Sequence, residues 1–242
     1  NEFNDDYAKL LDFGNTLLVA LFDNTATGPA VRVYKSTDSG SNWSAVATAF
    51  SGDGPKALLS WYNRAGDIVP VLVTIENIYW LDLTNSTLEA LLPAGLLSGN
   101  AADGRRATVA ADGNLYVPLG TGDILRLSLI SSAGAAYGIL VTNIGPHSKA
   151  LFQDADGLPT AFQGHANFLL GSDPRWLFVA YGGHAASKNA TILAFDYVTG
   201  AWHQVYNDAT ANRDLFWLHL SSEDDGAMRL HAVTEDPTAS IM

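Results

Sequence analysis

Carboxylates are the most numerous side chains in this sequence that could carry out chemistry. The 242 residues include 25 Asp and Glu, and hydrolysis of a glycosidic bond needs two of them held about 5–9.5 Å apart. Most of the acidic residues that can be placed fall in short polar turns, where a carboxylate accepts backbone N–H groups. We therefore interpret them as turn-forming, solvated side chains, and we predict no catalytic residue. The acidic residues in question are Asp112, Asp154, Asp156, Glu223, Asp224 and Asp225.

Two of these turns have the oxygen-rich composition of calcium loops. Residues 154–157 read Asp-Ala-Asp-Gly, and residues 223–226 read Glu-Asp-Asp-Gly. Neither continues to the Glu that closes an EF-hand loop, and both are ordinary β-turn signals. The six His show no helical ligand spacing such as His-x-x-x-His, which argues against zinc. We predict no metal site and no cofactor, with calcium as the alternative.

Composition and charge narrow the choice of chemistry and of partners. The chain has no Cys, so disulfides, Cys-based metal sites and thiol nucleophiles are excluded. The formal net charge of −12 would repel nucleic acid and anionic membranes. No segment approaches the roughly 18 apolar residues of a membrane span, so we expect no membrane insertion.

A strand–turn–strand pattern recurs along the chain, and the acidic turns described above lie between its expected strands. Short apolar runs bounded by Gly, Asn, Asp and Ser are typical of strands, and a regular period of this length is typical of propeller blades. Two hairpins in each repeat would make one blade of four antiparallel strands, and a second hairpin follows the first in four of the five repeats. The centres of the five repeats, 46 to 62 residues apart, are Val19, Val71, Val117, Val179 and Ala232.

The sequence thus predicts an all-β fold, a single β-propeller domain over residues 1–242. A β-sandwich is the alternative, although sandwiches do not normally repeat one hairpin pair with one period. An insertion occupies residues 145–164. The fifth repeat contains only a short third segment, so we expect a truncated propeller; closure by an N-terminal strand is the alternative. The approximate repeats are 8–50, 56–98, 105–144, 165–208 and 213–242.

One loop of the fourth repeat is the best candidate for contact with a ligand. Gly182-Gly183 follows the very hydrophobic segment 176–181 and precedes a polar run. In propellers the loop between the second and third strands of a blade faces the usual ligand site. We therefore predict that Tyr181, His184 and Lys188 contact a ligand; the alternative is a flexible loop with ordinary polar residues.

The turn of residues 36–43 carries the one specific motif. It reads Ser-Thr-Asp-Ser-Gly-Ser-Asn-Trp, in which Ser36 and Asp38 can accept backbone N–H groups, Gly40 permits a positive φ, and Trp43 can pack its ring on the hairpin. This pattern, Ser-x-Asp-x-Gly-x-x-Trp between two expected strands, resembles the Asp-box or BNR-repeat propellers. That group includes sialidases, other glycosidases, sortilin-type receptors and photosystem assembly factors. Residues 198–202 are similar to a degenerate copy.

The resemblance implies a structural role for Ser36, Asp38, Gly40 and Trp43, because the Asp box lies on the rim of the blade, away from the catalytic face. A sialidase would also show an Arg-Ile-Pro motif, three Arg that grip a carboxylate, an acidic acid/base and a Tyr–Glu pair. No Arg-Ile-Pro occurs, and the eight Arg are scattered along the chain.

These observations favour a non-catalytic binding or structural module over an enzyme. We expect it to bind a glycan or a protein in a larger extracellular or virion assembly, since residues 181–183 and 199–202 loosely resemble blades of phage tail proteins. The alternative is a sialidase-like glycoside hydrolase with part of its active site outside this chain. Convergence of three Arg and two carboxylates at the channel mouth would distinguish the two.

Overall fold

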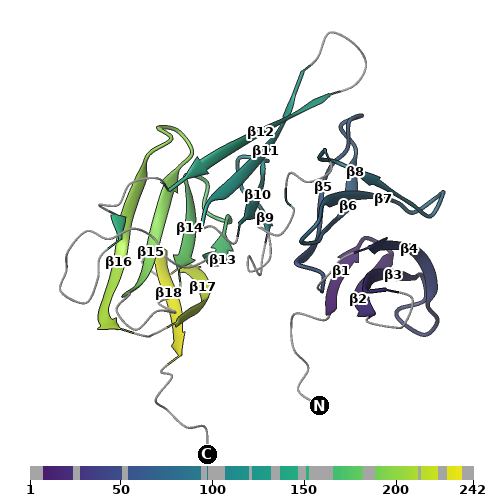
Figure 1. Ribbon diagram of the computed structural model, residues 1–242, viewed down its shortest axis with the longest axis horizontal. Coiled ribbons are helices and arrows are strands. Elements are labelled where there is room, and N and C mark those ends of the chain that lie inside the picture. The colour runs from purple at the N-terminus through teal and green to yellow at the C-terminus, as the bar shows by residue number, and fades with distance from the viewer. Residues whose placement is uncertain are drawn as a thin grey trace, which may run out of the picture. The chain divides into compact units, whose positions relative to one another are not determined.

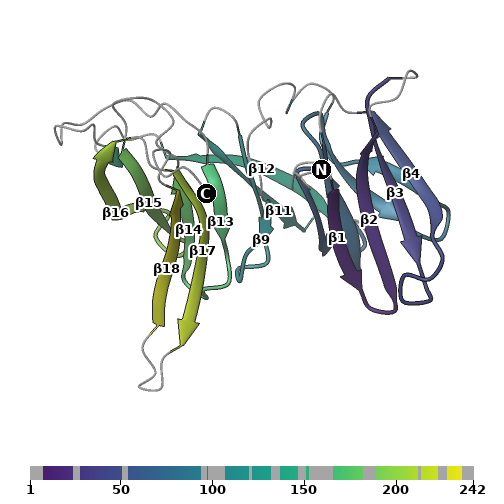
Figure 2. The same cartoon turned by 90° about the horizontal axis from the view of Figure 1, so that it is seen from below.

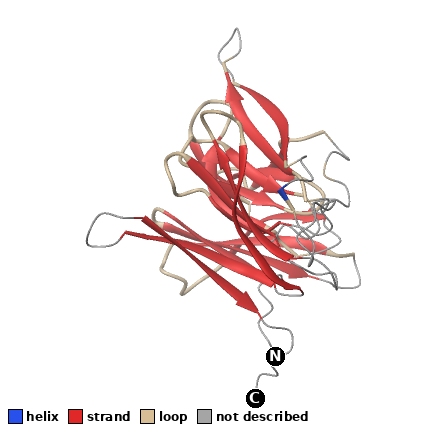
Figure 3. Cartoon of the chain, turned by 90° about the vertical axis from the view of Figure 1, so that its left-hand side faces the viewer, coloured by secondary structure: helices blue, strands red, loops and turns tan. Residues whose placement is uncertain are grey.

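The described part of the protein consists almost entirely of β-strands and turns (Figure 3). The computed structural model describes residues 8–23, 28–50, 54–93, 97, 107–119, 122–131, 137–146, 151–152, 166–181, 189–211, 214–222 and 228–235. Within these ranges, no helix has the length and hydropathy that a membrane span requires.

The strands form antiparallel sheets in which sequence neighbours are also spatial neighbours. Figure 2 shows this order most clearly for the first sheet, in which four strands lie side by side in chain order. The first sheet consists of β1 (Ala8–Phe13), β2 (Thr16–Asp23), β3 (Ala30–Ser36) and β4 (Ser44–Phe50). The second consists of β5 (Ala57–Tyr62), β6 (Ile68–Val73), β7 (Ile78–Asp82) and β8 (Thr87–Ala90).

Two further four-stranded sheets and one two-stranded sheet follow (Figure 1). The third sheet consists of β9 (Thr108–Val109), β10 (Leu115–Pro118), β11 (Ile124–Ile130) and β12 (Gly138–Gly145). The fourth consists of β13 (Ala166–Leu170), β14 (Trp176–Tyr181), β15 (Asn189–Asp196) and β16 (Trp202–Ala211). The two-stranded sheet pairs β17 (Asp214–Ser222) with β18 (Met228–Glu235).

The chain divides into two compact units. One comprises residues 1–102 and 128–140, and the other comprises residues 103–127 and 141–242. The boundary therefore crosses the β11–β12 hairpin.

The first unit has its own core between the first two sheets. Val31 and Val33 alternate with outward-facing residues on β3, as the two-residue period of a strand requires, and both are fully buried. They pack with Leu18 of β2 and with residues of the second sheet that include Leu72 and Leu81. Burial of such side chains contributes about 1.5–3 kcal/mol each, so this sheet-on-sheet contact stabilises the unit.

The second unit contains two buried clusters that join its sheets. Leu177, Val179, Leu193 and Phe195 of the fourth sheet pack with Tyr116 of the third. The opposite face of the fourth sheet packs on the two-stranded sheet, with Leu215 and Leu218 of β17 as partners of Ala180 and Ile192. Within this unit the third, fourth and two-stranded sheets thus bury apolar faces against one another in chain order.

The third and fourth sheets approach closely at Gly171. A Cβ atom at this position would lie 2.8 Å from both Cα and Cβ of Ala110. The Ala111 N–H donates to the Gly171 carbonyl oxygen across 2.9 Å. Gly171 is therefore required by a backbone-to-backbone contact within the second unit.

The predicted fold class is confirmed: the protein is all-β, with propeller-like four-stranded antiparallel sheets and one sheet in each of the five repeats. The assignment of residues 1–242 to a single domain stays a prediction. Of the predicted insertion, residues 145–146 and 151–152 are described, and the others lie outside the described residues.

Candidate functional site

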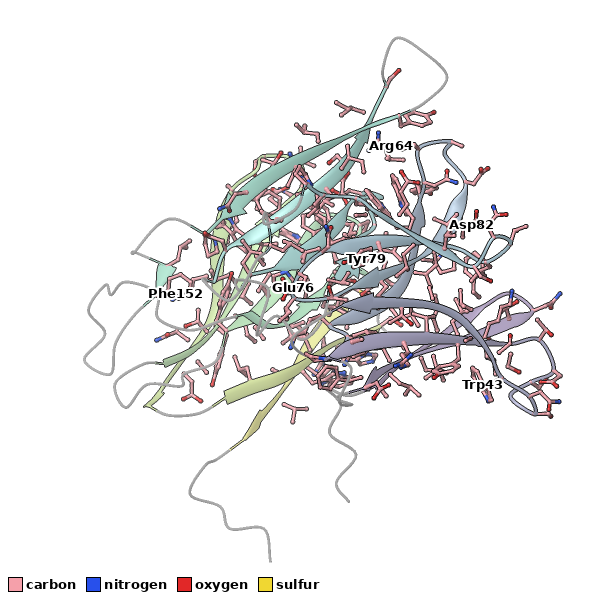
Figure 4. All side chains as sticks on the ribbon, turned by 45° about the vertical axis from the view of Figure 1, so that its right-hand side comes forward. Trp43, Arg64, Glu76, Tyr79, Asp82 and Phe152 are labelled. Carbon is pink, nitrogen blue, oxygen red and sulfur yellow. The ribbon has the colours of Figure 1, made fainter. Side chains whose placement is uncertain are left out.

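The turn between β3 and β4 is held by side-chain bonds to the backbone. The Ser36 hydroxyl accepts the Gly40 N–H at 2.9 Å, and it donates to Asp38 Oδ1 at 2.7 Å. The Trp43 indole Nε1 donates to the Gly40 carbonyl oxygen at 3.0 Å, and Gly40 has a φ of +90°. Trp43 lies at this turn of the first sheet (Figure 4) and is 42% exposed.

Asp38 is the centre of this turn. Its Oδ1 accepts the Asn42 backbone N–H at 2.8 Å, and its Oδ2 accepts the Asn42 side-chain amide at 2.6 Å. The bonds from Asn42, followed by the bond from Ser36, lower the pKa of Asp38 from 3.8 to about 2. A carboxyl with so low a pKa is ionised at neutral pH, so Asp38 can accept hydrogen bonds but is a poor general acid.

The same two-point bond between an Asp and an Asn recurs in the next two sheets, and we call it the Asp–Asn clasp. Asp82, at the end of β7, accepts the Asn85 N–H at 3.0 Å and its side-chain amide at 2.6 Å. Asp112 binds Asn114 in the same way, at 3.0 and 2.6 Å. The spacing between the two partners is four residues in the first sheet, three in the second and two in the third. The clasp is thus independent of the length of the turn.

The clasp of the third sheet is linked to a buried tyrosine. The Tyr116 hydroxyl donates to Asp112 Oδ2 at 2.7 Å. Burial raises the pKa of Tyr116 far above its ordinary value of 10, and the bond to Asp112 adds to the shift. Tyr116 therefore stays protonated and acts as a hydrogen-bond donor to the turn. The prediction that Asp112 is turn-forming agrees with these contacts.

In the fourth sheet an arginine takes the place of the clasp's Asn. Arg175 donates through Nη2 to Asp196 Oδ2 at 2.9 Å, and Asp196 Oδ1 accepts the Val198 N–H at 2.8 Å. The bond from Arg175 is the main cause that lowers the pKa of Asp196 to about 2. The Trp202 indole donates to the Ile144 carbonyl oxygen at 2.7 Å, whereas Trp43 bonds within its own turn. This turn therefore differs from the one at residues 36–43.

Tyr181 is described, whereas His184 and Lys188, the other two predicted ligand contacts, lie outside the described residues. Tyr181 is only 1% exposed; its hydroxyl donates to the Gly122 carbonyl oxygen at 3.2 Å, and its ring packs edge-on against Phe152. Burial raises its pKa well above 10. These contacts give Tyr181 a packing role between the fourth sheet and the β10–β11 loop. The ligand-contact hypothesis for the three residues stays a prediction.

A pocket of about 390 Å³ with both polar and apolar lining residues lies on the second sheet, where the sequence pointed to no site. Arg64 lies over the Trp80 ring at 5.7 Å from its centroid, and Figure 4 shows Arg64 and Asp82 on this sheet. Asp82 has a lowered pKa, chiefly through the bonds from Asn85. The pocket is lined by Asn63, Arg64, Ala65, Val69, Trp80, Leu81, Asp82, Thr87 and Glu89. No sequence signal marks this pocket, because its residues come from three strands and a turn.

Three of the described arginines each contact a different partner in a different sheet. Arg32 pairs with Asp23 in the first sheet, Arg64 lies over Trp80 in the second, and Arg175 pairs with Asp196 in the fourth. The described residues show no group of three or more His, Asp and Glu that could hold a metal ion. The two turns for which calcium was the alternative interpretation, 154–157 and 223–226, lie outside the described residues.

Comparisons with known proteins do not indicate a function for this chain. No protein-family profile matches the chain, and no curated protein does. Among solved structures, a puromycin-hydrolysing peptidase of Mycobacterium tuberculosis aligns with 82% of this chain at 17% identity and a TM-score of 0.44. A candidate 6-phosphogluconolactonase of Bacteroides uniformis aligns with 98% of it at 13% identity and a TM-score of 0.47.

The chain spans 28% of the length of that peptidase and 69% of that of the lactonase. At these scores the two likenesses carry no argument about what this protein binds or catalyses.

Proposed function

We propose that this chain is a non-catalytic, propeller-like module of the Asp-box type that binds a glycan or a protein partner in an extracellular or virion assembly. The observation that carries the proposal is the engagement of its turn carboxylates. Asp38, Asp82, Asp112 and Asp196 each accept at least one backbone N–H of their own turn. Three of them have a lowered pKa, which suits a structural acceptor and opposes the role of a general acid.

The pocket of the second sheet supports a binding role. Its volume of about 390 Å³ is near the lower end of the roughly 300–1,000 Å³ of ligand pockets. Arg64 supplies donors, Glu89 supplies acceptors and Thr87 supplies both, which suits a partner with several hydroxyl or amide groups. A single sugar residue or a polar peptide segment has this chemistry.

A glycan array probed with the whole chain tests the proposal, together with an assay of a fluorogenic sialoside. We expect binding that weakens at least about tenfold in Arg64→Ala and Glu89→Gln, and no turnover of the sialoside. Glu76→Gln is the matched control, since the Glu76 side chain is exposed and lies outside the pocket.

Two results would contradict the proposal. Turnover of the sialoside by the wild-type chain would favour the hydrolase alternative. Equal binding by wild type and both pocket variants would remove the pocket from the argument. Absence of binding to every glycan of the array would rule out the glycan and leave a protein as the partner class.

A further inference from the structure

The two-stranded sheet presents an exposed face on which two histidines are direct neighbours. In the register of β17 and β18, His219 is paired with His231, and Trp217 with Val233. Both imidazoles are exposed, and their ring centroids are 6.3 Å apart with an interplanar angle of 35°. Because alternate residues of a strand point to the same side, these four side chains share one face, while Leu218 points into the core.

We propose that His219 and His231 together bind a transition-metal ion, with Cu²⁺ as the tightest of the divalent first-row ions. Imidazole nitrogen is a ligand that suits copper, nickel and zinc, and the affinity of nitrogen sites generally peaks at Cu²⁺. The proposal is independent of the proposed function, because it concerns a different sheet and a different kind of ligand.

The geometry of the pair needs only a small adjustment to chelate an ion. Metal–nitrogen bonds of about 2.0–2.1 Å bring two imidazole centroids to roughly 5–6 Å of one another, close to the 6.3 Å observed. Both side chains are exposed, so a rotation about their side-chain bonds closes the difference without moving the core. Water would complete the coordination.

A neighbouring hydroxyl supports this assignment. Ser221 Oγ lies 2.8 Å from His231 Nε2. In the tautomer in which Nε2 donates to Ser221, the lone pair of Nδ1 is available to a metal. A ligating His commonly donates its other ring N–H to a protein acceptor, which fixes the tautomer and the orientation of the ring.

The stacking of Trp217 on His219 supplies a built-in reporter. Their ring centroids are 5.3 Å apart and the planes are nearly parallel, at 7°. A Cu²⁺ ion on His219 would therefore lie close to the indole and quench its fluorescence. The Trp217→Phe variant should retain affinity for Cu²⁺ in calorimetry and lose this part of the quenching.

Titration of the whole chain with Cu²⁺ alone, followed by calorimetry and tryptophan fluorescence, tests the proposal. We expect His219→Ala and His231→Ala each to lose at least about tenfold in affinity, since loss even of an outer-shell partner typically costs 10–100-fold. His203→Ala is the control, because His203 is also exposed and lies 5.3 Å from a tryptophan, edge-on to Trp176. Affinity in this control should equal that of the wild type.

An electron paramagnetic resonance spectrum of unmodified protein with one equivalent of Cu²⁺ provides a readout that needs no variant. Nitrogen splitting from two imidazoles supports the proposal, and splitting from one imidazole overturns it. Affinity that is unchanged in either His219→Ala or His231→Ala also overturns it, because both rings must be ligands.

Discussion

At the scale of single residues, the lowered pKa of Asp38 makes the stability contributed by the turn of residues 36–43 depend on pH. The pKa of Asp38 is lowered to about 2 from an ordinary 3.8, first by the bonds from Asn42 and then by that from Ser36. The folded state therefore favours the ionised form. The stability that this preference contributes is fully present above about pH 4 and is lost as the pH falls toward 2.

We accordingly predict that Asp38→Asn is less stable than wild type at pH 7 and that the difference shrinks between pH 4 and pH 2. Urea unfolding at a series of pH values measures the free energy of unfolding of both proteins. Thr48→Ala, at an exposed position of β4 outside the turn, is the control because it removes no ionisable group, and its stability should change between pH 7 and pH 2 as much as that of the wild type. If the free energies of unfolding of Asp38→Asn and wild type differ by the same amount at pH 7 and pH 2, ionisation of Asp38 does not stabilise the turn.

The Asp–Asn clasp of the second sheet allows a test at one atom. Asn85→Ala removes the side-chain amide that donates to Asp82 Oδ2, so we predict that the pKa of Asp82 rises toward its ordinary value. Carboxyl ¹³C chemical shifts followed through an acid titration measure this. Thr84→Ala keeps the Thr84 N–H that donates to Asp82 Oδ1 and should leave the pKa lowered; an equal rise in both variants would assign the effect to the turn as a whole.

At the scale of the elements, the close approach at Gly171 sets how the third and fourth sheets pack. An added Cβ would meet the Cα and Cβ of Ala110 at 2.8 Å, and backbone atoms cannot move aside as a flexible side chain can. We predict that Gly171→Ala destabilises the fold by about 1–3 kcal/mol, the usual cost of overpacking. Urea unfolding measures it, and the exposed neighbour Ser172→Ala should match wild type. A Gly171→Ala variant as stable as wild type would contradict the contact.

The hairpins could be predicted from the sequence because strand formation follows local patterns. Short apolar runs flanked by turn residues indicated the strands, and the paired turns of the first four repeats indicated four-stranded sheets. The clasps in the second and third sheets were not predicted, since the spacing from Asp to Asn changes with each turn. A search for one fixed motif finds only Asp38.

Contacts between residues on paired strands could not be predicted from the local sequence patterns. His219 and His231 are twelve residues apart, and helical spacing was the pattern considered. Antiparallel register is symmetric about a hairpin turn, and each histidine lies three residues from the last observed pair before the turn, Ser222 with Met228. The pair can therefore be found only once the ends of the two strands are known. The pocket of the second sheet and the contact of Gly171 with Ala110 depend on tertiary packing, for which no local pattern exists.

At the scale of the whole molecule, the buried clusters follow the division into two compact units. The cluster that contains Leu18 belongs to the first unit, and the clusters that contain Leu193 and Leu215 belong to the second. Each described cluster therefore joins sheets of one unit. Since cooperative unfolding depends on shared buried contacts, and each unit has buried clusters of its own, each unit can unfold in a separate step.

We predict two resolvable steps in the thermal unfolding of the chain. Leu18 and Leu193 are fully buried, so truncation of either to Ala should cost about 2–5 kcal/mol. Leu18→Ala should lower the midpoint of one step and Leu193→Ala that of the other, as followed by differential scanning calorimetry. If the chain is instead one cooperative propeller, each variant will shift a single common transition, since the free-energy cost in one unit is then shared by both.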